Sequence, residues 1–120
     1  MKRLPIYLIL CAALLASCSQ KQKAKSTVKA FLEANMAEQS DYSVSDFGKL
    51  DSTSYVTDST LTAMRQLAQA NKTFRKDIKY GKRPAKEQLK YITAKLSVNE
   101  TDTTYTFYLT NNLEAVVSFK

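Results

Sequence analysis

Two cysteine thiols, at positions 11 and 18, are the most reactive side chains of this 120-residue chain. No cysteine follows Cys18, and the chain has no histidine. Everything beyond Cys18 therefore lacks a thiol nucleophile, a disulfide, a thiolate metal site and the commonest general base. The sequence also contains no nucleophile elbow, phosphate loop or zinc-ligand spacing. We expect no enzyme activity, no cofactor and no bound metal.

The segment before Cys18 has the parts of an export signal. Met1-Lys2-Arg3 is a short positive start, and Ile6 to Ala16 is an unbroken apolar run of eleven residues. A membrane-spanning helix needs about 20 such residues, so this run is too short to cross a bilayer and matches a secretory signal. Polar residues 19–23 follow at once.

Leu15-Ala16-Ser17-Cys18 resembles the bacterial lipobox, a branched apolar residue and two small residues before an obligatory cysteine. In lipoproteins of this class the thiol receives a diacylglyceryl group, the signal is removed, and the new amino terminus is acylated. The resemblance implies a signal peptide over residues 1–17, fatty acyl groups such as palmitate on Cys18, and a polar tether over residues 18–25. Two or more acyl chains hold a protein stably on a membrane. The alternative is ordinary secretion after a site such as Ala16-Ser17.

The residues after Cys18 bear on where the protein resides. Ser19 is not the acidic residue that retains some lipoproteins at the inner membrane, and residues 19–25 lack the acidic cluster of a Bacteroidota surface-export signal. We therefore expect a membrane-anchored protein of the cell envelope, which faces the periplasm from the outer membrane in a Gram-negative cell.

Three hydroxyl-bearing triplets are candidates for modification. Asp-Ser-Thr occurs at residues 51–53 and again at 58–60, and residues 102–104 are the related Asp-Thr-Thr. These triplets resemble the acceptor sequence of Bacteroidota O-glycosylation, whose acceptors here would be Ser52, Ser59 and Thr103. The alternative is that the second triplet caps a helix and the third forms a turn. Both readings hold together only where the hydroxyl stays exposed.

A basic segment follows in residues 72–90. Eight basic side chains stand against Asp77 and Glu87, a local charge of +6, whereas the chain without residues 1–17 carries +5 in total. Such a patch attracts anionic lipid headgroups, lipopolysaccharide phosphates, anionic glycans or an envelope protein. Nucleic acid is not expected, because the signal exports the chain. The alternative is a solvated helix end and loop. The candidate patch consists of Lys72, Arg75, Lys76, Lys79, Lys82, Arg83 and Lys86.

Hydrophobic periodicity predicts two helices. Val28, Phe31, Leu32 and Met36 indicate a helix over residues 26–38, with Ser26 as its N-cap. Residues 40–57 alternate with a slip near Ser45-Asp46, which fits either a bulged strand or an irregular loop. Asp58 or Ser59 would cap a second helix that ends at Tyr80-Gly81 at the latest, with an apolar stripe of Leu61, Met64, Leu67, Ala68 and Phe74.

Strict alternation predicts three strands in the last thirty residues. Their inward residues are Ile92, Ala94, Leu96 and Val98, then Tyr105, Phe107 and Leu109, then Ala115, Val117 and Phe119. We expect Val98 opposite Tyr105 across an even loop at 100–103 or 101–102. We expect Leu109 opposite Ala115 across a three-residue turn at 111–113, whose asparagines tolerate a left-handed backbone. Tyr91 and Tyr108 would then lie exposed on the opposite face, as candidates for a carbohydrate or peptide groove.

The helix beginning at Ser26, the small middle segment and the C-terminal meander resemble the small NTF2-like or cystatin-like lipoproteins of Bacteroidota over most of residues 26–120. The resemblance implies a single α+β domain, with two amphipathic helices packed on one face of a three- to four-stranded antiparallel meander. NTF2-like enzymes use acid/base residues in a cone-shaped cavity, and cystatin-type inhibitors use a Gln-x-Val-x-Gly hairpin. This chain has no histidine and no such hairpin, so neither activity is carried over.

Three functions agree with these patterns. The first is a non-enzymatic, lipid-anchored module that binds a ligand or partner in the envelope. The second is a small NTF2-like enzyme or a degenerate descendant of one, which a deep pocket with convergent carboxylates would favour. The third is a structural subunit of an envelope complex, which an exposed edge strand would favour.

Overall fold

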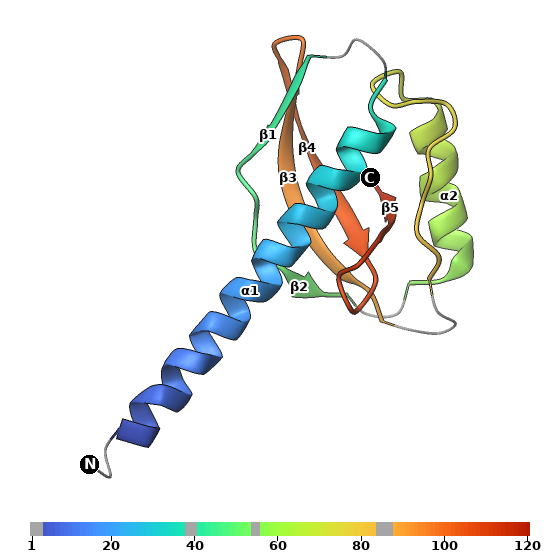
Figure 1. Cartoon of the computed structure of the whole chain (residues 1–120). Helices are drawn as coiled ribbons and strands as arrows, with labels where there is room; N and C mark the ends of the chain where they lie inside the picture. The colour runs from blue at the N-terminus through green and yellow to red at the C-terminus, as the bar shows by residue number, and fades with distance from the viewer. Residues whose placement is uncertain (1–3, 38–40, 54–55, 84–87) are drawn as a thin grey trace.

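The computed structural model describes the backbone of residues 4–37, 41–53, 56–83 and 88–120, and the side chains of these ranges from Ser19 onward. Within them the chain forms two helices and an open, five-stranded antiparallel sheet of order β1-β3-β4-β5, with β2 also paired to β3 (Figure 1). The predicted α+β architecture of helices on an antiparallel meander is confirmed. The elements are α1 (Leu4–Asn35), β1 (Tyr42–Ser45), β2 (Asp51–Ser52), α2 (Asp58–Gln69), β3 (Lys90–Val98), β4 (Thr101–Leu109) and β5 (Val116–Phe119).

Helix α1 buries the predicted apolar stripe but begins earlier than predicted. Val28 and Leu32 are fully buried, and Phe31 is nearly so. The N-cap predicted at Ser26 is wrong, because the helix already runs through residues 19–25. Lys, Gln and Ala dominate that stretch, and all three are good helix formers. Ala24 is fully buried, so the polar segment is part of the folded domain rather than an irregular tether.

The slip in residues 40–57 corresponds to two short strands separated by a kink. Asp46 has a φ of 51° directly after β1, and β1 and β2 both pair with β3. Between them the backbone N–H of Gly48 donates to the carbonyl of Thr93 at 2.9 Å. A Cβ at Gly48 would lie 2.2 Å from Thr93 Oγ1, so the close approach requires glycine.

Helix α2 begins one residue earlier than the earliest predicted start and ends well before the latest predicted end. Its N-cap is Thr57, whose side chain accepts from the N–H of Thr60 at 3.2 Å, and it ends at Gln69 rather than near residue 80. A turn at Asn71 follows, in which the Asn71 side chain accepts from the N–H of Thr73 at 3.0 Å. Two assignments to the apolar stripe are therefore wrong: Leu67 is 74% exposed, and Phe74 enters the core from the loop.

The β3–β4 hairpin turns two residues earlier in the chain than predicted. The observed register pairs Val98 with Thr101 and Ile92 with Phe107, four residues away from the predicted pairing. The turn is Asn99-Glu100, with φ angles of 49° and 69°. Two left-handed residues give the primed turn whose twist suits a hairpin. The shift is an even number of residues, so the inward faces of both strands are still the predicted ones.

The β4–β5 connection departs from the predicted three-residue turn. The N–H of Thr110 donates to the carbonyl of Ala115 at 3.0 Å across a four-residue loop. Leu113, not an asparagine, takes the left-handed conformation, with a φ of 63°. A register shift between Tyr108 and Leu109 follows. As a result Val117 lies in a different hydrophobic cluster from Phe107, contrary to the prediction.

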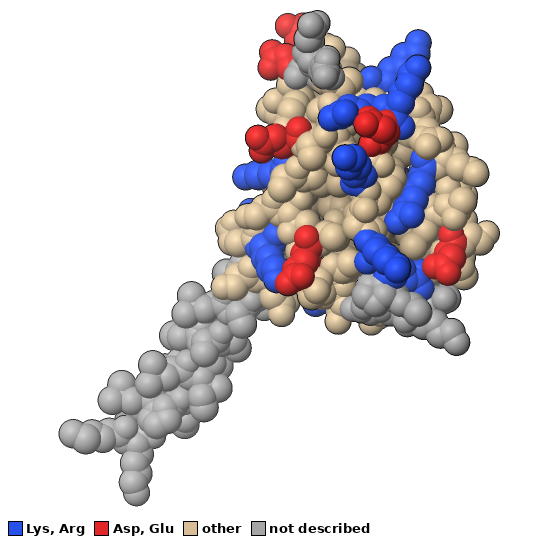
Figure 2. Space-filling view, turned by 45° about the vertical axis from the view of Figure 1, so that its right-hand side comes forward, with Lys and Arg blue, Asp and Glu red and all other residues tan. Residues whose placement is uncertain are grey.

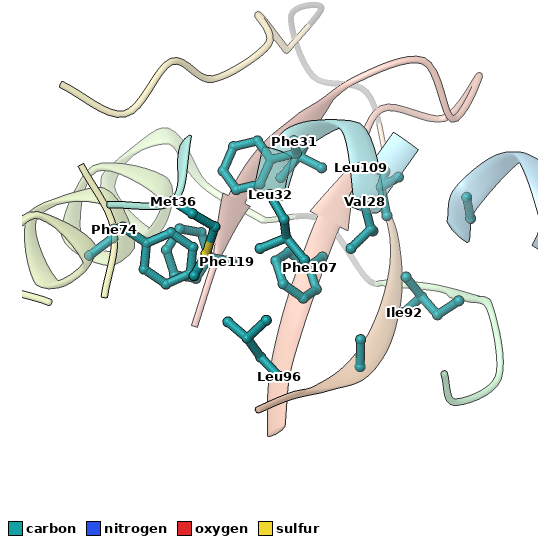
Figure 3. Packing of buried hydrophobic residues seen from close by; sticks show 14 of the residues in the cluster. Val28, Phe31, Leu32, Met36, Phe74, Ile92, Leu96, Phe107, Leu109 and Phe119 are labelled. Atoms are coloured by element: carbon teal, nitrogen blue, oxygen red, sulfur yellow. The ribbon is translucent and has the colours of Figure 1, made fainter. Parts of the chain in front are cut away.

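The interior consists of two clusters of buried apolar residues. The larger lies between α1 and the sheet and includes Val28, Leu32, Phe107 and Phe119 (Figure 3). The smaller brings Leu61 and Met64 of α2 against Leu89, Tyr108 and Val117. Every buried residue of both clusters lies between Ala24 and Phe119. Among the described side chains, the apolar core therefore begins at Ala24, six residues after Cys18.

None of the helices in the described part of the chain combines the length and the apolar character needed to cross a membrane.

Candidate functional site: a basic loop beside β5

The described part of the basic segment, residues 72–83, is a loop that runs from the end of α2 along the edge of the sheet (Figure 1). Its backbone is held at three points. The N–H of Arg75 donates to the carbonyl of Asn35 at 2.8 Å, the N–H of Lys79 donates to Asn35 Oδ1 at 2.8 Å, and the N–H of Gly81 donates to the carbonyl of Val116 at 2.8 Å. The loop therefore covers the outer edge of β5 and presents its side chains from a fixed backbone.

Asn35, the last residue of α1, fastens this loop to the helix. It is only 3% exposed, and its Nδ2 donates to the carbonyls of Phe31 at 2.9 Å and Lys79 at 3.4 Å. Asn35 was not identified as a functional residue from the sequence. It could have been recognised as a polar side chain three residues after Leu32, on the apolar side of the predicted helix, where a buried amide needs hydrogen-bond partners.

Most of the predicted basic side chains are exposed on this loop. Arg75 forms a two-pronged ion pair with Asp77, at 3.1 and 3.2 Å. Figure 2 shows one face of the molecule, on which basic side chains gather with acidic side chains between them. Lys86 lies outside the described residues. Four exposed lysines form no ion pair with any described acidic residue: Lys72, Lys76, Lys79 and Lys82.

The end of the loop and α2 border an open hollow of about 360 Å³. Arg65 of α2 lines it, with Nε donating to the carbonyl of Val117 at 2.9 Å and the guanidinium 4.7 Å from the centre of the Tyr80 ring. Burial raises the pKa of the Tyr80 hydroxyl above its ordinary value, and the Arg65 charge partly opposes this rise. Arg65 was not part of the predicted patch, because only folding brings α2 beside residues 80–83.

Arg83 lines the same hollow but differs from the exposed lysines. Its side chain is only 4% exposed, and its Nη1 lies 3.8 Å from the carboxylate of Asp58, which is 91% exposed. Nη1 also donates to the carbonyl of Val56. Arg83 is therefore a buried support at the edge of the hollow, and the accessible positive charge there belongs chiefly to Lys82 and Arg65.

A second hollow, of about 450 Å³, adjoins the first at Gly81, which lines both. It lies between α1 and the start of β5, and Phe31 and Lys79 line it. At its other end Lys23 Nζ lies 3.8 Å from Glu114 Oε1. The cations of the loop, together with Arg65, are called the basic face: Lys72, Arg75, Lys76, Lys79, Lys82 and Arg65, with Arg83 buried at its edge. Of the exposed loop lysines, Lys79 lines the second hollow and Lys82 lines the first.

The three candidate glycosylation sites are exposed and lie on separate elements. Ser52 is on β2 opposite Lys90, Ser59 is in the first turn of α2, and Thr103 is on β4 opposite Leu96. Each residue is exposed. The alternative roles are wrong, because Thr57 rather than the second triplet caps α2, and residues 102–104 lie within β4 rather than in a turn. The structure does not gather the three hydroxyls into one site.

The tyrosine pair predicted as an exposed platform is largely covered. Tyr91 and Tyr108 are adjacent across β3 and β4, with ring centres 6.2 Å apart. Tyr108 is only 9% exposed, because α2 packs against it through Leu61 and Met64. The prediction of an exposed Tyr108 is wrong, since the second helix covers that part of the opposite face.

Carboxylates do not converge in a deep pocket among the described residues. Glu114 in the larger hollow is 67% exposed and pairs with Lys23. Asp41 and Glu100 share a shallow hollow at the β3–β4 hairpin, where both are exposed. No cluster of three or more potential metal ligands occurs in the part of the chain that the structure describes.

Comparison of the chain with protein-family models, curated proteins and solved structures gives no match.

Proposed function

We propose that the chain is a lipoprotein anchored at Cys18, and that its domain is a non-enzymatic module that binds anionic glycans of the cell envelope through the basic face. The observation that carries the proposal is the set of four exposed lysines without a described acidic partner, on a loop whose backbone is bonded to α1 and to β5 at three points. The lipobox-like Leu15-Ala16-Ser17-Cys18 supports the anchor and an envelope location, with the outer membrane facing the periplasm as the expected site.

The hydrogen bonds that hold the loop backbone favour a binding surface over a merely solvated loop. An ordered array of cations does not lose backbone freedom when a ligand binds, so more of the electrostatic attraction appears as affinity. Clustered charge of one sign also raises the local concentration of oppositely charged ligands. Both effects weaken as salt shortens the screening length from about 10 Å at 0.1 M to about 3 Å at 1 M.

A glycan is favoured over other anions by the shape of the surface. The hollows at Gly81 are open and lined by Phe31, Tyr80 and small side chains as well as cations. Sugar rings need such mixed lining, whereas a simple ion needs only charge. A small NTF2-like enzyme remains the second candidate by resemblance, but the described hollows offer no pair of buried carboxylates for it.

A structural role rests on a single feature. β1 is an edge strand of the sheet, with Ser43 and Ser45 exposed. The left-handed Asp46 ends it after four residues. A short, kinked edge is a poor template for strand addition. The edge therefore gives this third candidate less support than the basic face gives to ligand binding.

The binding test uses the mature chain, residues 18–120, with Cys18→Ser to remove the thiol. Dextran sulfate is the anionic probe and unmodified dextran the neutral one. Lys76→Gln/Lys79→Gln should weaken dextran sulfate binding about tenfold, if each exposed contact contributes about 0.7 kcal/mol, within the range for surface charges. Lys29→Gln/Lys49→Gln is the matched control, with two exposed lysines and the same change in net charge. Equal losses in both variants, or equal binding of the two dextrans, would refute the basic face as the site.

The anchor is tested separately, on the protein purified from its own membranes. Its first residue should be Cys18, and the N-terminal peptide should carry the mass of diacylglyceryl and acyl groups. A chain that still begins at Met1, or a Cys18 peptide of unmodified mass, would refute the anchor. The same spectra test glycosylation, which should add hexose to the peptides containing Ser52, Ser59 and Thr103.

A further inference from the structure

Helix α1 connects the proposed acylation site to the core without a flexible tether. Its backbone is helical from Leu4 to Asn35, and among the side chains described from Ser19 onward Ala24 is the first that is fully buried in the larger cluster. Six helical residues span about 9 Å at 1.5 Å per residue, so the core begins within about 9 Å of Cys18 along the helix axis. A domain joined in this way cannot swing freely on its acyl chains, as a domain on an unstructured tether would.

The same turns of α1 carry a row of lysines. Lys21, Lys25 and Lys29 are spaced by four residues and therefore share one side of the helix. Lys25 Nζ and Lys29 Nζ lie 5.6 and 5.8 Å from the centre of the Phe47 ring. Lys23 lies on another side, beside Glu114. The end of the domain nearest the acylation site is thus positively charged on more than one side.

Distance along the helix decides which of these lysines can sense a membrane surface. At 1.5 Å per residue, Lys21 and Lys25 stand about 5 and 11 Å from Cys18. The screening length at physiological salt is about 8 Å, so these two lie within roughly one screening length of the headgroups. Lysines near an anionic bilayer each strengthen binding by about fivefold.

We propose that the end of the domain formed by residues 19–25 of α1 docks on anionic phospholipid headgroups, and that α1 holds the domain in one orientation on the membrane. The inference rests on the proposed acylation of Cys18, which places these lysines at the bilayer. In this orientation β2 and the β4–β5 turn lie toward the membrane, and the β3–β4 hairpin lies at the far end of the domain (Figure 1).

Orientation can be measured because the mature chain has one cysteine and no tryptophan. We would couple Cys18 to a maleimide phospholipid in vesicles that contain phosphatidylglycerol and a dansyl-labelled headgroup lipid. Single tryptophans would replace exposed Gln22, near the anchor, or exposed Thr101, at the hairpin. Energy transfer should be strong from position 22 and weak from position 101. Twelve Gly and Ser residues inserted between Cys18 and Ser19 should reduce that difference. Equal transfer from both positions without the insertion would overturn the fixed orientation.

Headgroup docking is tested on the Cys18→Ser mature chain, without any acyl group. Lys21→Gln/Lys25→Gln should lower its affinity for phosphatidylglycerol vesicles about 25-fold, which is fivefold for each lysine. Lys76→Gln/Lys79→Gln is the charge-matched control and should have a clearly smaller effect. An equal or smaller loss in the α1 variant would overturn docking by this end.

Failure of this inference is distinguishable from failure of the proposed function. The vesicle experiments supply the lipid chemically, so they do not depend on acylation in the cell. An unmodified Cys18 in the native protein would refute the anchor whatever the vesicles show. A coupled protein that adopts no preferred orientation would refute the rigid α1 connection and leave the anchor standing.

Discussion

Replacing Asn35 with alanine should both destabilise the domain and disorder the basic face. The substitution removes the side-chain donor to the Phe31 and Lys79 carbonyls and the acceptor for the Lys79 N–H. An ordinary hydrogen bond contributes about 1 kcal/mol, and a buried group left without a partner costs about 1–3 kcal/mol. The bond at 3.4 Å is long and counts for little, so we expect a loss of about 2–3 kcal/mol. For a domain of this size that lowers Tm by about 10–20 °C.

Urea unfolding of the Cys18→Ser mature chain, followed by far-UV circular dichroism, measures this loss directly. The midpoint should fall with little change in slope, because the same surface is exposed on unfolding. Asn35→Asp is the informative partner variant, since it keeps the acceptor for the Lys79 N–H but loses both donated bonds and buries a charge at neutral pH. Dextran sulfate binding should weaken with Asn35→Ala even under conditions where the protein remains folded, because Lys76 and Lys79 leave their fixed positions. A change below 0.5 kcal/mol together with unchanged binding would refute the role of Asn35 as the clamp of the loop.

Three further outcomes test other parts of the fold. Gly48→Ala should destabilise the domain by about 1–3 kcal/mol through overpacking, and Thr93→Ala should rescue it, because the Cβ of Thr93 lies at an acceptable 3.5 Å once the hydroxyl is gone; no rescue in urea unfolding would contradict the close approach. Glu100→Gly should stabilise the protein by about 0.5–1 kcal/mol, since Glu100 has a φ of 69°, and an unchanged or lower midpoint would argue against the left-handed turn. Tyr80→Phe should raise stability by about 1 kcal/mol at neutral pH, because the Tyr80 hydroxyl is buried without a partner among the described residues. The raised pKa of Tyr80 means that the unfolded chain ionises this hydroxyl more readily than the folded domain does. The wild type should therefore lose stability as pH rises above 10 through this group, whereas Tyr80→Phe should not. Parallel pH profiles of the two proteins would refute the burial of the hydroxyl.

Alternation along the chain was sufficient to predict the sheet but not its register. Side chains alternate with a period of two, so any even shift of Val98 against β4 leaves the same faces buried. Both predicted loops, 100–103 and 101–102, are centred two residues beyond the observed Asn99-Glu100 turn, which requires two left-handed residues, one of them a glutamate. Face assignment was therefore correct for β3 and β4, whereas residue pairing was wrong. The register of β5 against β4 shifts between Tyr108 and Leu109, which places Val117 in the smaller hydrophobic cluster. The sequence around these residues contains no pattern from which such a shift could be predicted.

The helices show where composition misleads. Residues 19–25 are polar, and polarity alone suggested a tether, yet their intrinsic helix propensity continues α1 and buries Ala24. Phe74 fits a helical stripe but reaches the core from a loop, because the Asn71 turn intervenes. The charges of the basic face could be predicted from the run of lysines. Its support by Asn35 and Arg65 could not be predicted, because it depends on long-range contacts. Asn35 and Lys79 are separated by 44 positions in the sequence, and Arg65 and Val117 by 52.

The length of α1 separates the two surfaces that the proposals assign to anions. Cys18 and Asn35 are the two ends of a continuous helical stretch whose 17 intervals span about 26 Å. The basic face is fastened at the far end, where Arg75 and Lys79 bond to Asn35. If α1 stands steeply on the membrane, that end lies about three screening lengths from the headgroups at physiological salt. The membrane would then occupy the lysines near Cys18 and leave those of the loop to soluble or wall-bound anions. The two sets of lysines should consequently respond independently: vesicle affinity should follow Lys21 and Lys25, and glycan affinity should follow Lys76 and Lys79. A shared response in both assays would mean that α1 lies flat and that the basic face is part of the membrane contact.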